Sequence, residues 1–460
     1  MKRLKILFLS GFLLPILLSA QSSVLGLADF YEIVLQHHPI AKQANLLNQR
    51  GELVVSQARG AFDPKIVSDF NRKNFDGKNY FDLWDTYVQV PTLLNFDLKA
   101  GFEQNSGLFL NPENTVPSDG LYYAGIAVPL GQGMIHNERR INLQKSKFQN
   151  KAFQNDANNV LNNLLLDANY VYWWWYENYK KREAVRTNLR LINERFEGIR
   201  QGTLNGENAP IDSVEMLIQV QQWSNNLKNA DLNLQNSYLL LQNLIWSDSI
   251  QTPVLTPQSE LVKSQFNIDE SLDWAMLHHP QLKQLAIERD LLDLDRKMAS
   301  EMLKPIIDVN YNLLLSGQED TQPSYFSNNY KLGVGFAFPL LIRKERAKLK
   351  IVKNKQQEYG FKIDQKTREV LNKIRQNYNK VFTLQAMIQQ QEEMLVNYER
   401  MLQAEQSKFD NGESSVFLLN SRENKKLQGQ IKLIELEAKY SRSIGELKWS
   451  TGKLYDEAIN

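Results

Sequence analysis

Four of the five histidines in this 460-residue chain lie in two copies of one His-His-Pro step, at 37–39 and 278–280. Paired imidazoles are common ligands of zinc and copper, so a metal site is the first hypothesis. The chain has no cysteine, and no third histidine or carboxylate recurs beside both pairs at a ligand spacing. We therefore predict no metal site, and interpret each step as the polar end of a short helix followed by a proline-initiated helix.

The similarity between the two copies continues beyond the histidines, which indicates that the chain contains an internal duplication. Residues that match without a gap are Lys42 and Lys283, Leu53 and Leu294, Ala58 and Ala299, and Pro64 and Pro305. An internal repeat, rather than length alone, then sets the domain organisation.

Composition and motifs argue against several functional classes. A formal charge of +2 with a pI near 8.3 gives no basic stripe for nucleic acid. The absence of cysteine excludes disulfides, a thiol nucleophile and a lipidated N-terminal cysteine. No nucleophile elbow is present, and the glycines at 131–133 lack the lysine and hydroxyl of a phosphate loop. We predict no enzyme, and no catalytic, cofactor-binding or metal-binding residues.

The first twenty residues predict export of the protein. Basic residues near the start precede a short apolar run that ends in Ser19-Ala20, as in a secretory signal peptide. The remaining chain has no apolar run of about 18 to 20 residues, the length of a membrane-spanning helix. Any membrane anchorage must therefore come from strands.

Each copy predicts one order of elements: helix, helix, strand, strand, long helix, turn, helix. In the second copy, Ile307, Val309 and Tyr311 alternate with polar residues, which predicts a strand with one apolar and one polar face. The predicted strands lie at about 64–73, 120–129, 305–315 and 330–340. Segment 74–118 in the first copy either adds strands, at about 80–105, or forms a long loop.

Two segments predict very long helices. Residues 135–197 contain neither glycine nor proline, and 341–411 contain only Gly360, so each helix could reach roughly 90 to 100 Å. A glycine-bearing turn ends each helix, where Gly202 and Gly412 would supply the permissive backbone. Asp212 and Ser415 are expected to be the N-caps of the returning helices.

The predicted organisation has four parts. They are a signal peptide at 1–20, a first structural repeat at 21–247, an interrepeat linker at 248–268 and a second repeat at 269–460.

Strands with one apolar and one polar face suit a transmembrane barrel, but four such strands cannot close into one. Because an open sheet edge is not tolerated in hydrocarbon, several chains must combine. We predict a mainly α fold with transmembrane β, in which three chains form a 12-stranded β-barrel. Long, polar helices with narrow apolar stripes would continue it as a hollow periplasmic α-helical barrel.

The whole mature chain resembles the TolC-like outer-membrane efflux family, the outer membrane factors. The resemblance rests on strand exits followed by "ERR" at 138–140 or "ERA" at 345–347, and on the turn Phe409, Gly412, Ser415. It implies a homotrimeric channel-tunnel of a tripartite efflux or type I secretion system in the outer membrane of a Gram-negative cell. A periplasmic adaptor (membrane fusion protein) and an inner-membrane RND or ABC transporter would be its partners, beside outer-membrane lipid.

The resemblance also implies that both helix turns form the periplasmic mouth. Gly202, Asp212, Gly412 and Ser415 would then lie in the adaptor-docking tips. Asp410 and Glu413 either line the pore mouth and favour cations or are solvated turn residues. Two departures are expected: the first turn, 202–212, is longer than the second, and Leu418 stands where many relatives carry an acidic residue.

Two rival hypotheses remain. A periplasmic coiled-coil scaffold without a pore would have no use for strands with a lipid-like face. An exported hydrolase or metal enzyme would require an activity that depends on the histidines. The aromatic run at 170–179 is too far along its helix from the predicted barrel for a membrane belt, and we expect it to pack against helices or the linker.

Overall fold

The structure, a computed structural model, describes residues 24–246, 256–257, 266–316 and 328–458. The predicted signal peptide and most of the predicted linker lie outside these residues. The chain divides into two compact units. The turn unit contains the described residues within 1–34, 168–263 and 385–442, and the sheet unit contains those within 35–167, 264–384 and 443–460.

The two halves of the chain contain helices in the same order and of nearly equal length. The pairs are α1 (Leu27–His37) and α5 (Ile268–His278), with 11 residues each; α2 (Pro39–Arg59) and α6 (Pro280–Glu301), with 21 and 22; α3 (Glu138–Leu204) and α8 (Arg343–Asp410), with 67 and 68; and α4 (Pro210–Ile245) and α9 (Val416–Thr451), with 36 each. Short helices lie at η1 (Gly60–Phe62), η2 (Pro112–Asn114) and α10 (Leu454–Ala458). In the described part of the chain, no helix combines the length and the apolar character needed to cross a membrane.

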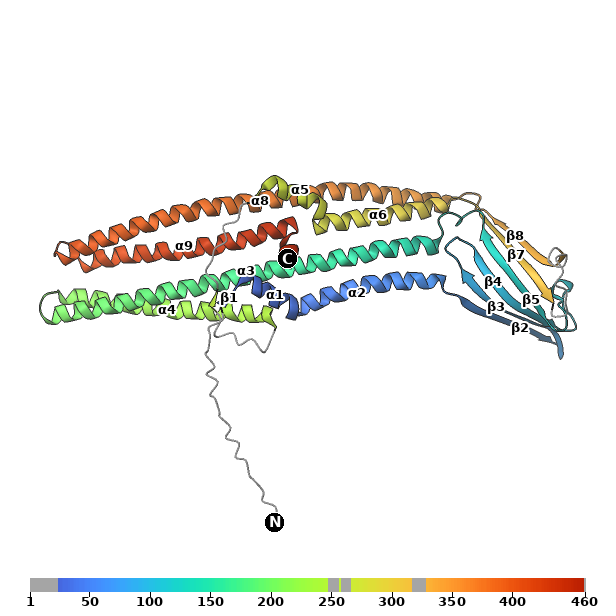
Figure 1. The fold of residues 1–460 in the computed structure, drawn as a ribbon, viewed down its shortest axis with the longest axis horizontal. Coiled ribbons are helices and arrows are strands. Elements are labelled where there is room, and N and C mark those ends of the chain that lie inside the picture. The colour runs from blue at the N-terminus through green and yellow to red at the C-terminus, as the bar shows by residue number, and fades with distance from the viewer. Residues whose placement is uncertain (1–23, 247–255, 258–265, 317–327, 459–460) are drawn as a thin grey trace, which may run out of the picture. The chain divides into compact units, whose positions relative to one another are not determined.

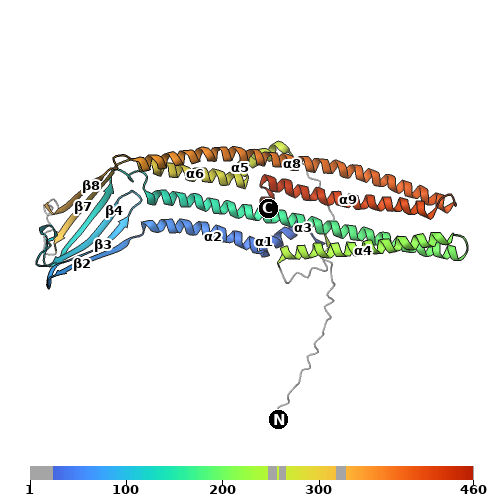
Figure 2. The same cartoon turned by 180° about the vertical axis from the view of Figure 1, so that it is seen from behind.

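One antiparallel sheet of six strands forms an end of the sheet unit and appears as a curled layer in Figures 1 and 2. Its strands, in spatial order, are β2 (Lys65–Phe75), β3 (Lys78–Pro91), β4 (Asp97–Ser106), β5 (Leu121–Pro129), β7 (Ile306–Ser316) and β8 (Tyr330–Ala337). The mainly helical fold with alternating strands is therefore confirmed. Of the two alternatives for 74–118, the added strands are confirmed, because β3 and β4 are integral members of the sheet. The count of four strands per chain, on which the 12-stranded barrel rested, is wrong.

The reason the sequence left 74–118 open is visible in β3. Trp84 and Val88 lie on one face of this strand, whereas Leu83 and Tyr87 lie on the other. Apolar residues on both faces obscure the period-2 alternation that identifies a half-buried strand. The partner strand β4 follows through a tight turn in which Asn95 adopts a left-handed backbone, with φ of 68°.

Helices in the sheet unit contact one another through polar as well as apolar side chains. Lys145 of α3 forms an ion pair with Asp295 of α6. Further along the same unit, Asn377 of α8 donates to the carbonyl of Glu446 in α9 at 3.1 Å. Such contacts suit helices that pack side by side with both faces wet.

The aromatic run of α3 packs inside the turn unit. Tyr172, Trp173, Trp175 and Tyr176 are buried, and the Tyr172 ring lies 5.9 Å from that of Phe30 in α1. The Tyr172 hydroxyl donates to the Leu25 carbonyl in β1 (Val24–Leu25) at 2.8 Å, and β1 pairs in parallel with β6 (Thr256–Pro257). The expected packing against helices is confirmed, and the described piece of the linker reaches the same segment.

Candidate functional sites

Both His-His-Pro steps form helix joints of the same design. His38 Nδ1 accepts the Ile40 N–H at 3.2 Å, and His279 Nδ1 accepts the Gln281 N–H at 3.2 Å. Each histidine is thus the N-cap of a helix whose first residue is proline, as predicted. Among the described residues, no three metal-ligating side chains form a group.

His279 must be neutral to act in this way, because a protonated Nδ1 cannot accept a hydrogen bond. Burial lowers its pKa to about 4, and the nearby charge of Lys366 acts in the same direction. Burial also lowers the pKa of His38. His38 and His279 are therefore neutral capping groups.

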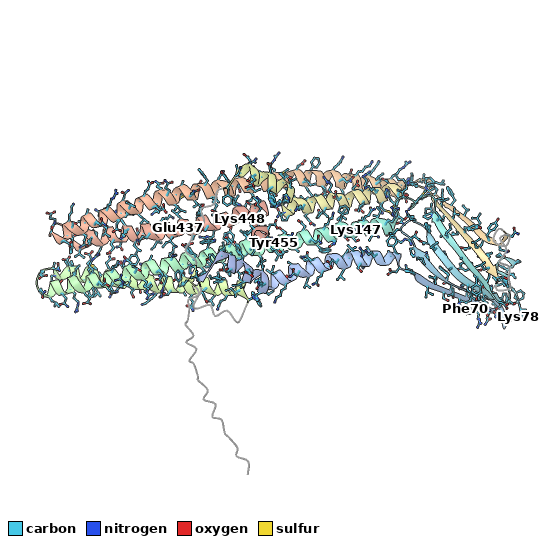
Figure 3. All side chains as sticks on the ribbon, in the orientation of Figure 1. Phe70, Lys78, Lys147, Glu437, Lys448 and Tyr455 are labelled. Carbon is cyan, nitrogen blue, oxygen red and sulfur yellow. The ribbon has the colours of Figure 1, made fainter. Side chains whose placement is uncertain are left out.

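One face of the sheet is largely apolar. The strand register places the half-buried Tyr311 of β7 on this face together with exposed large side chains from the other five strands: Ile66, Phe70, Trp84, Val88, Leu98, Tyr122, Ile126, Leu332, Val334 and Phe336. Phe70 points from β2 near the end of the sheet at which Lys78 begins β3 (Figure 3). A surface of this extent on extended strands matches the lipid-facing side of a membrane sheet.

The opposite face is polar and is the concave side of the curl. The Tyr123 hydroxyl donates to Asp85 at 2.9 Å, and its ring lies over Gly101, where a Cβ would approach Tyr123 to 2.7 Å. Lys331 of β8 reaches Glu103 of β4 at 3.6 Å, across the two strands between them. An ion pair that spans strands in this way requires the face to curve inward, so it can border an aqueous space.

The β3–β4 hairpin is tied to the start of α3. Arg139 donates to Asp97 at 2.6 Å, and Asn137 donates to Asn95. Asn95 also donates to the Met134 carbonyl. Arg139 belongs to the "ERR" segment singled out in the sequence, and its contact fixes the strand-to-helix junction.

The two helix turns share one backbone design. In the first, Glu207 N–H bonds to Gly202 O and Gly206 N–H to Thr203 O; in the second, Glu413 N–H bonds to Lys408 O and Gly412 N–H to Phe409 O. This pattern is a Schellman motif, which requires a left-handed residue after the helix. Gly206 and Gly412 supply it, with φ of 80° and 78°.

Two predictions for the first turn are wrong. The left-handed residue is Gly206, not Gly202, which is the helical residue against which Asn208 packs so closely that a Cβ would lie 2.2 Å from its Nδ2. The two turns are also equal in length, because 205–209 and 411–415 join their helices. The Asn-Gly pair at 205–206 was the available sequence indication.

Of the two capping predictions, one is confirmed and one is wrong. Ser415 is the N-cap of α9, since its Oγ accepts the Leu418 N–H at 3.3 Å, as predicted. Asp212 is not a cap: it is the third residue of α4, and Ala209 occupies the N-cap without a side-chain bond. Asp212 still complements the positive end of the helix.

The two predicted mouth charges are exposed. Asp410 is the last residue of α8 and accepts a hydrogen bond from Gln406 of the same helix at 2.8 Å. Glu413 follows Gly412, at the position that Glu207 occupies in the first turn. Neither forms an ion pair with any residue that the structure describes.

Comparison with known protein families gives a match in the second half of the chain. Residues 272–453 match the family model described as outer membrane efflux protein. The match covers 182 of the 460 residues, all in the second structural repeat, and there the chain is similar to the outer membrane efflux protein family. The relatives are channel proteins rather than enzymes.

Solved structures of efflux channels share the fold across nearly the whole chain. The outer-membrane channel OprN has 12% identity and a TM-score of 0.68, covering 93% of this chain and 90% of its own. VceC from Vibrio cholerae has 14% identity and a TM-score of 0.65, covering 93% of this chain and 96% of its own. The open state of Neisseria gonorrhoeae MtrE has 11% identity and a TM-score of 0.67, covering 93% of this chain and 89% of its own. No curated protein sequence matches the chain.

In the turn unit, side chains near the turns form interhelical bonds that the sequence did not reveal. Glu405 of α8 accepts from Ser414 at 2.6 Å and from Arg422 of α9 at 3.2 Å, and these partners lower the pKa of its carboxyl group. Arg195 of α3 pairs with Glu423 of α9. The partners lie on different helices, so no local spacing could indicate them.

Proposed function

We propose that three copies of this chain form a passive exit channel through the outer membrane. The observation that carries the proposal is the six-stranded sheet with one lipid-like face, one polar face and two edge strands, β2 and β8. An open edge in hydrocarbon leaves backbone groups without partners, so each edge must pair with another copy. An even number of antiparallel strands per chain makes β2 and β8 antiparallel on closure.

The number of strands in the proposed barrel follows from the sheet. The expectation of twelve strands rested on four per chain, whereas six per chain give eighteen in a trimer. Eighteen is even and within the range known for outer-membrane barrels. Since barrel diameter grows roughly linearly with strand number, this barrel would be about 1.5 times as wide as one of twelve strands.

The helices would continue the channel as a hollow barrel with polar walls. A periplasmic adaptor would dock at the two turns, on the surfaces that contain Gly202, Asp212, Gly412 and Ser415. An inner-membrane RND or ABC transporter would supply the energy, in tripartite efflux or in type I secretion. The channel itself would need no cofactor.

The exposed carboxylates Asp410 and Glu413 would lie at the mouth of the channel. Carboxylates around an aqueous constriction favour cations. Because neither forms an ion pair within the described residues, their charge is available to permeating ions.

Solubilisation, mass measurement and planar-bilayer conductance test both statements. We expect a detergent-dependent trimer that conducts, and a weaker cation preference in Asp410→Asn/Glu413→Gln. The matched control neutralises two exposed acids of the sheet unit, Glu52→Gln/Asp364→Asn. An unchanged cation preference would contradict the proposed role of Asp410 and Glu413 but not the proposal of a channel. A monomer that alkali or salt releases without detergent would instead support the coiled-coil scaffold.

A further inference from the structure

The start of α8 carries a dense group of cations. Residues 343–355, called the basic segment below, contain seven basic side chains and one acidic one, Glu345. The basic residues are Arg343, Lys344, Arg346, Lys348, Lys350, Lys353 and Lys355. All seven are exposed. The corresponding start of α3 differs, because its Arg139 is neutralised by Asp97.

These cations are poorly compensated by the protein itself. In the described part of the chain, Lys344, Arg346, Lys350 and Lys353 form no ion pair. Arg346 and Lys350 are four residues apart on one helix, a spacing at which like charges repel. Arg343, Lys344 and Arg346 also lie in the first turn, where the helix dipole disfavours positive charge. The segment therefore costs folding stability unless anions from outside neutralise it.

The position of the basic segment identifies the source of those anions. The apolar face of the sheet ends in β8 with Phe336, and an exposed apolar linker follows before α8. In this linker Leu340 is 93% exposed and Leu341 is 63% exposed. Apolar side chains followed at once by a polybasic helix match the boundary between hydrocarbon and headgroups.

A second copy of the chain would not supply the missing negative charge. If β8 pairs with β2 of a neighbour, the helix nearest that edge is α2, which follows into β2. The half of α2 next to β2 contains two basic residues, Arg50 and Arg59, and one acidic residue, Glu52. The neighbouring surface is thus itself slightly positive, and the excess of the basic segment remains.

We propose that the basic segment binds the anionic headgroups of phospholipids in the leaflet next to the strand-to-helix junction. Each cation near an anionic surface contributes roughly a fivefold preference. The lipid would both neutralise the start of α8 and fix the depth of the sheet in the membrane. The inference requires only that the sheet spans the membrane, and not that the chain conducts.

The test uses the full-length protein in nanodiscs of phosphatidylcholine with and without phosphatidylglycerol. The probe variant is Lys344→Gln/Lys350→Gln/Lys353→Gln. The matched control is Lys373→Gln/Arg400→Gln/Lys408→Gln, three exposed cations of the same helix, the nearest of them roughly 30 Å beyond Lys353 along the helix. Native mass spectrometry counts the lipids retained by each protein, and circular dichroism and conductance in phosphatidylcholine verify folding and the channel separately.

We expect wild type to retain phosphatidylglycerol over phosphatidylcholine by about tenfold or more at low salt, and much less at about 0.5 M salt. The probe variant should lose most of this preference and the control none. Equal retention of both lipids by wild type, or equal loss in the control, would overturn the proposal. So would displacement by inorganic phosphate, which would indicate a free-anion site. A different result would be that wild type shows no lipid preference but sediments with peptidoglycan, and that the probe variant does not. This result would indicate that the basic segment binds the cell wall instead.

Discussion

The two halves of the chain share their backbone but differ in their side chains. Both contain a His-capped, proline-initiated helix and a Schellman turn, and their paired long helices differ by one residue in length. They differ in strand number, with four strands from the first half and two from the second. They also differ in the cap of the returning helix, Ala209 or Ser415. The helix starts, the turns and the helix lengths are thus shared by the two halves, while side chains that face solvent or lipid differ.

The largest expected effect tests whether both halves contribute to one lipid-facing surface. Ile126→Lys in β5 and Leu332→Lys in β8, which lie opposite Tyr311 of β7 on its two sides, each place a charge on the apolar face. Each should lower the free energy of unfolding in lipid vesicles by about 2–4 kcal/mol near the bilayer midplane. Asn310→Lys, on the polar face of β7, is the control and should cost little. Comparable losses on both faces in urea titrations would show that the sheet does not separate lipid from water.

The second largest expected effect is a pH dependence of the free energy of unfolding, which should differ between the caps His279 and His38. The pKa of His279 in the folded protein, about 4, lies below its ordinary value of 6.5. Between these values the unfolded chain binds more protons, so stability is present above pH 6.5 and falls as the pH decreases toward 4. Relative to His279→Asn, whose amide oxygen can still cap the helix, wild type should lose up to about 3 kcal/mol over this window.

His38→Asn provides the matched comparison in the first half. Burial also lowers the pKa of His38, so the sign of its pH dependence is the same. The pKa of His38 is lowered less than that of His279, so a smaller change is expected. Urea titrations of all three proteins across the pH range measure both differences. Parallel curves for wild type and His279→Asn would contradict the neutral-cap assignment.

The sequence predicted those features that depend on local periodicity and on the duplication. The order of helices, the alternation around Ile307 and Val309, and the joint at His279-Pro280 each have a local pattern that the structure confirms. The location of the first turn was recognised, but Gly202 was chosen as its left-handed residue instead of Gly206. Two glycines four residues apart near a helix end both permit a left-handed backbone, and the Asn-Gly pair at 205–206 was the one local indication that favoured Gly206.

Features that depend on distant partners were out of reach. The β3–β4 hairpin was left open because its strands carry apolar residues on both faces, and its place in the sheet depends on Arg139 meeting Asp97. The bond between Glu405 and Arg422 likewise joins two helices. Such pairs have no fixed sequence spacing, so their prediction requires the three-dimensional arrangement. Adaptor docking at the turns stays a prediction.

The smallest effect exchanges the caps of the two turns. Ser415→Ala removes the bond to the Leu418 N–H and should cost about 1 kcal/mol, whereas Ala209→Ser should stabilise α4 by a similar amount. Because the backbones match, the double variant should have nearly the stability of wild type. Amide exchange at Leu418 is the sharpest measurement, and it should rise about fivefold in Ser415→Ala. If Ala209→Ser brings no slower exchange at the start of α4, then Pro210 already fixes that helix end, and the turns are equivalent in geometry but not in what stabilises them.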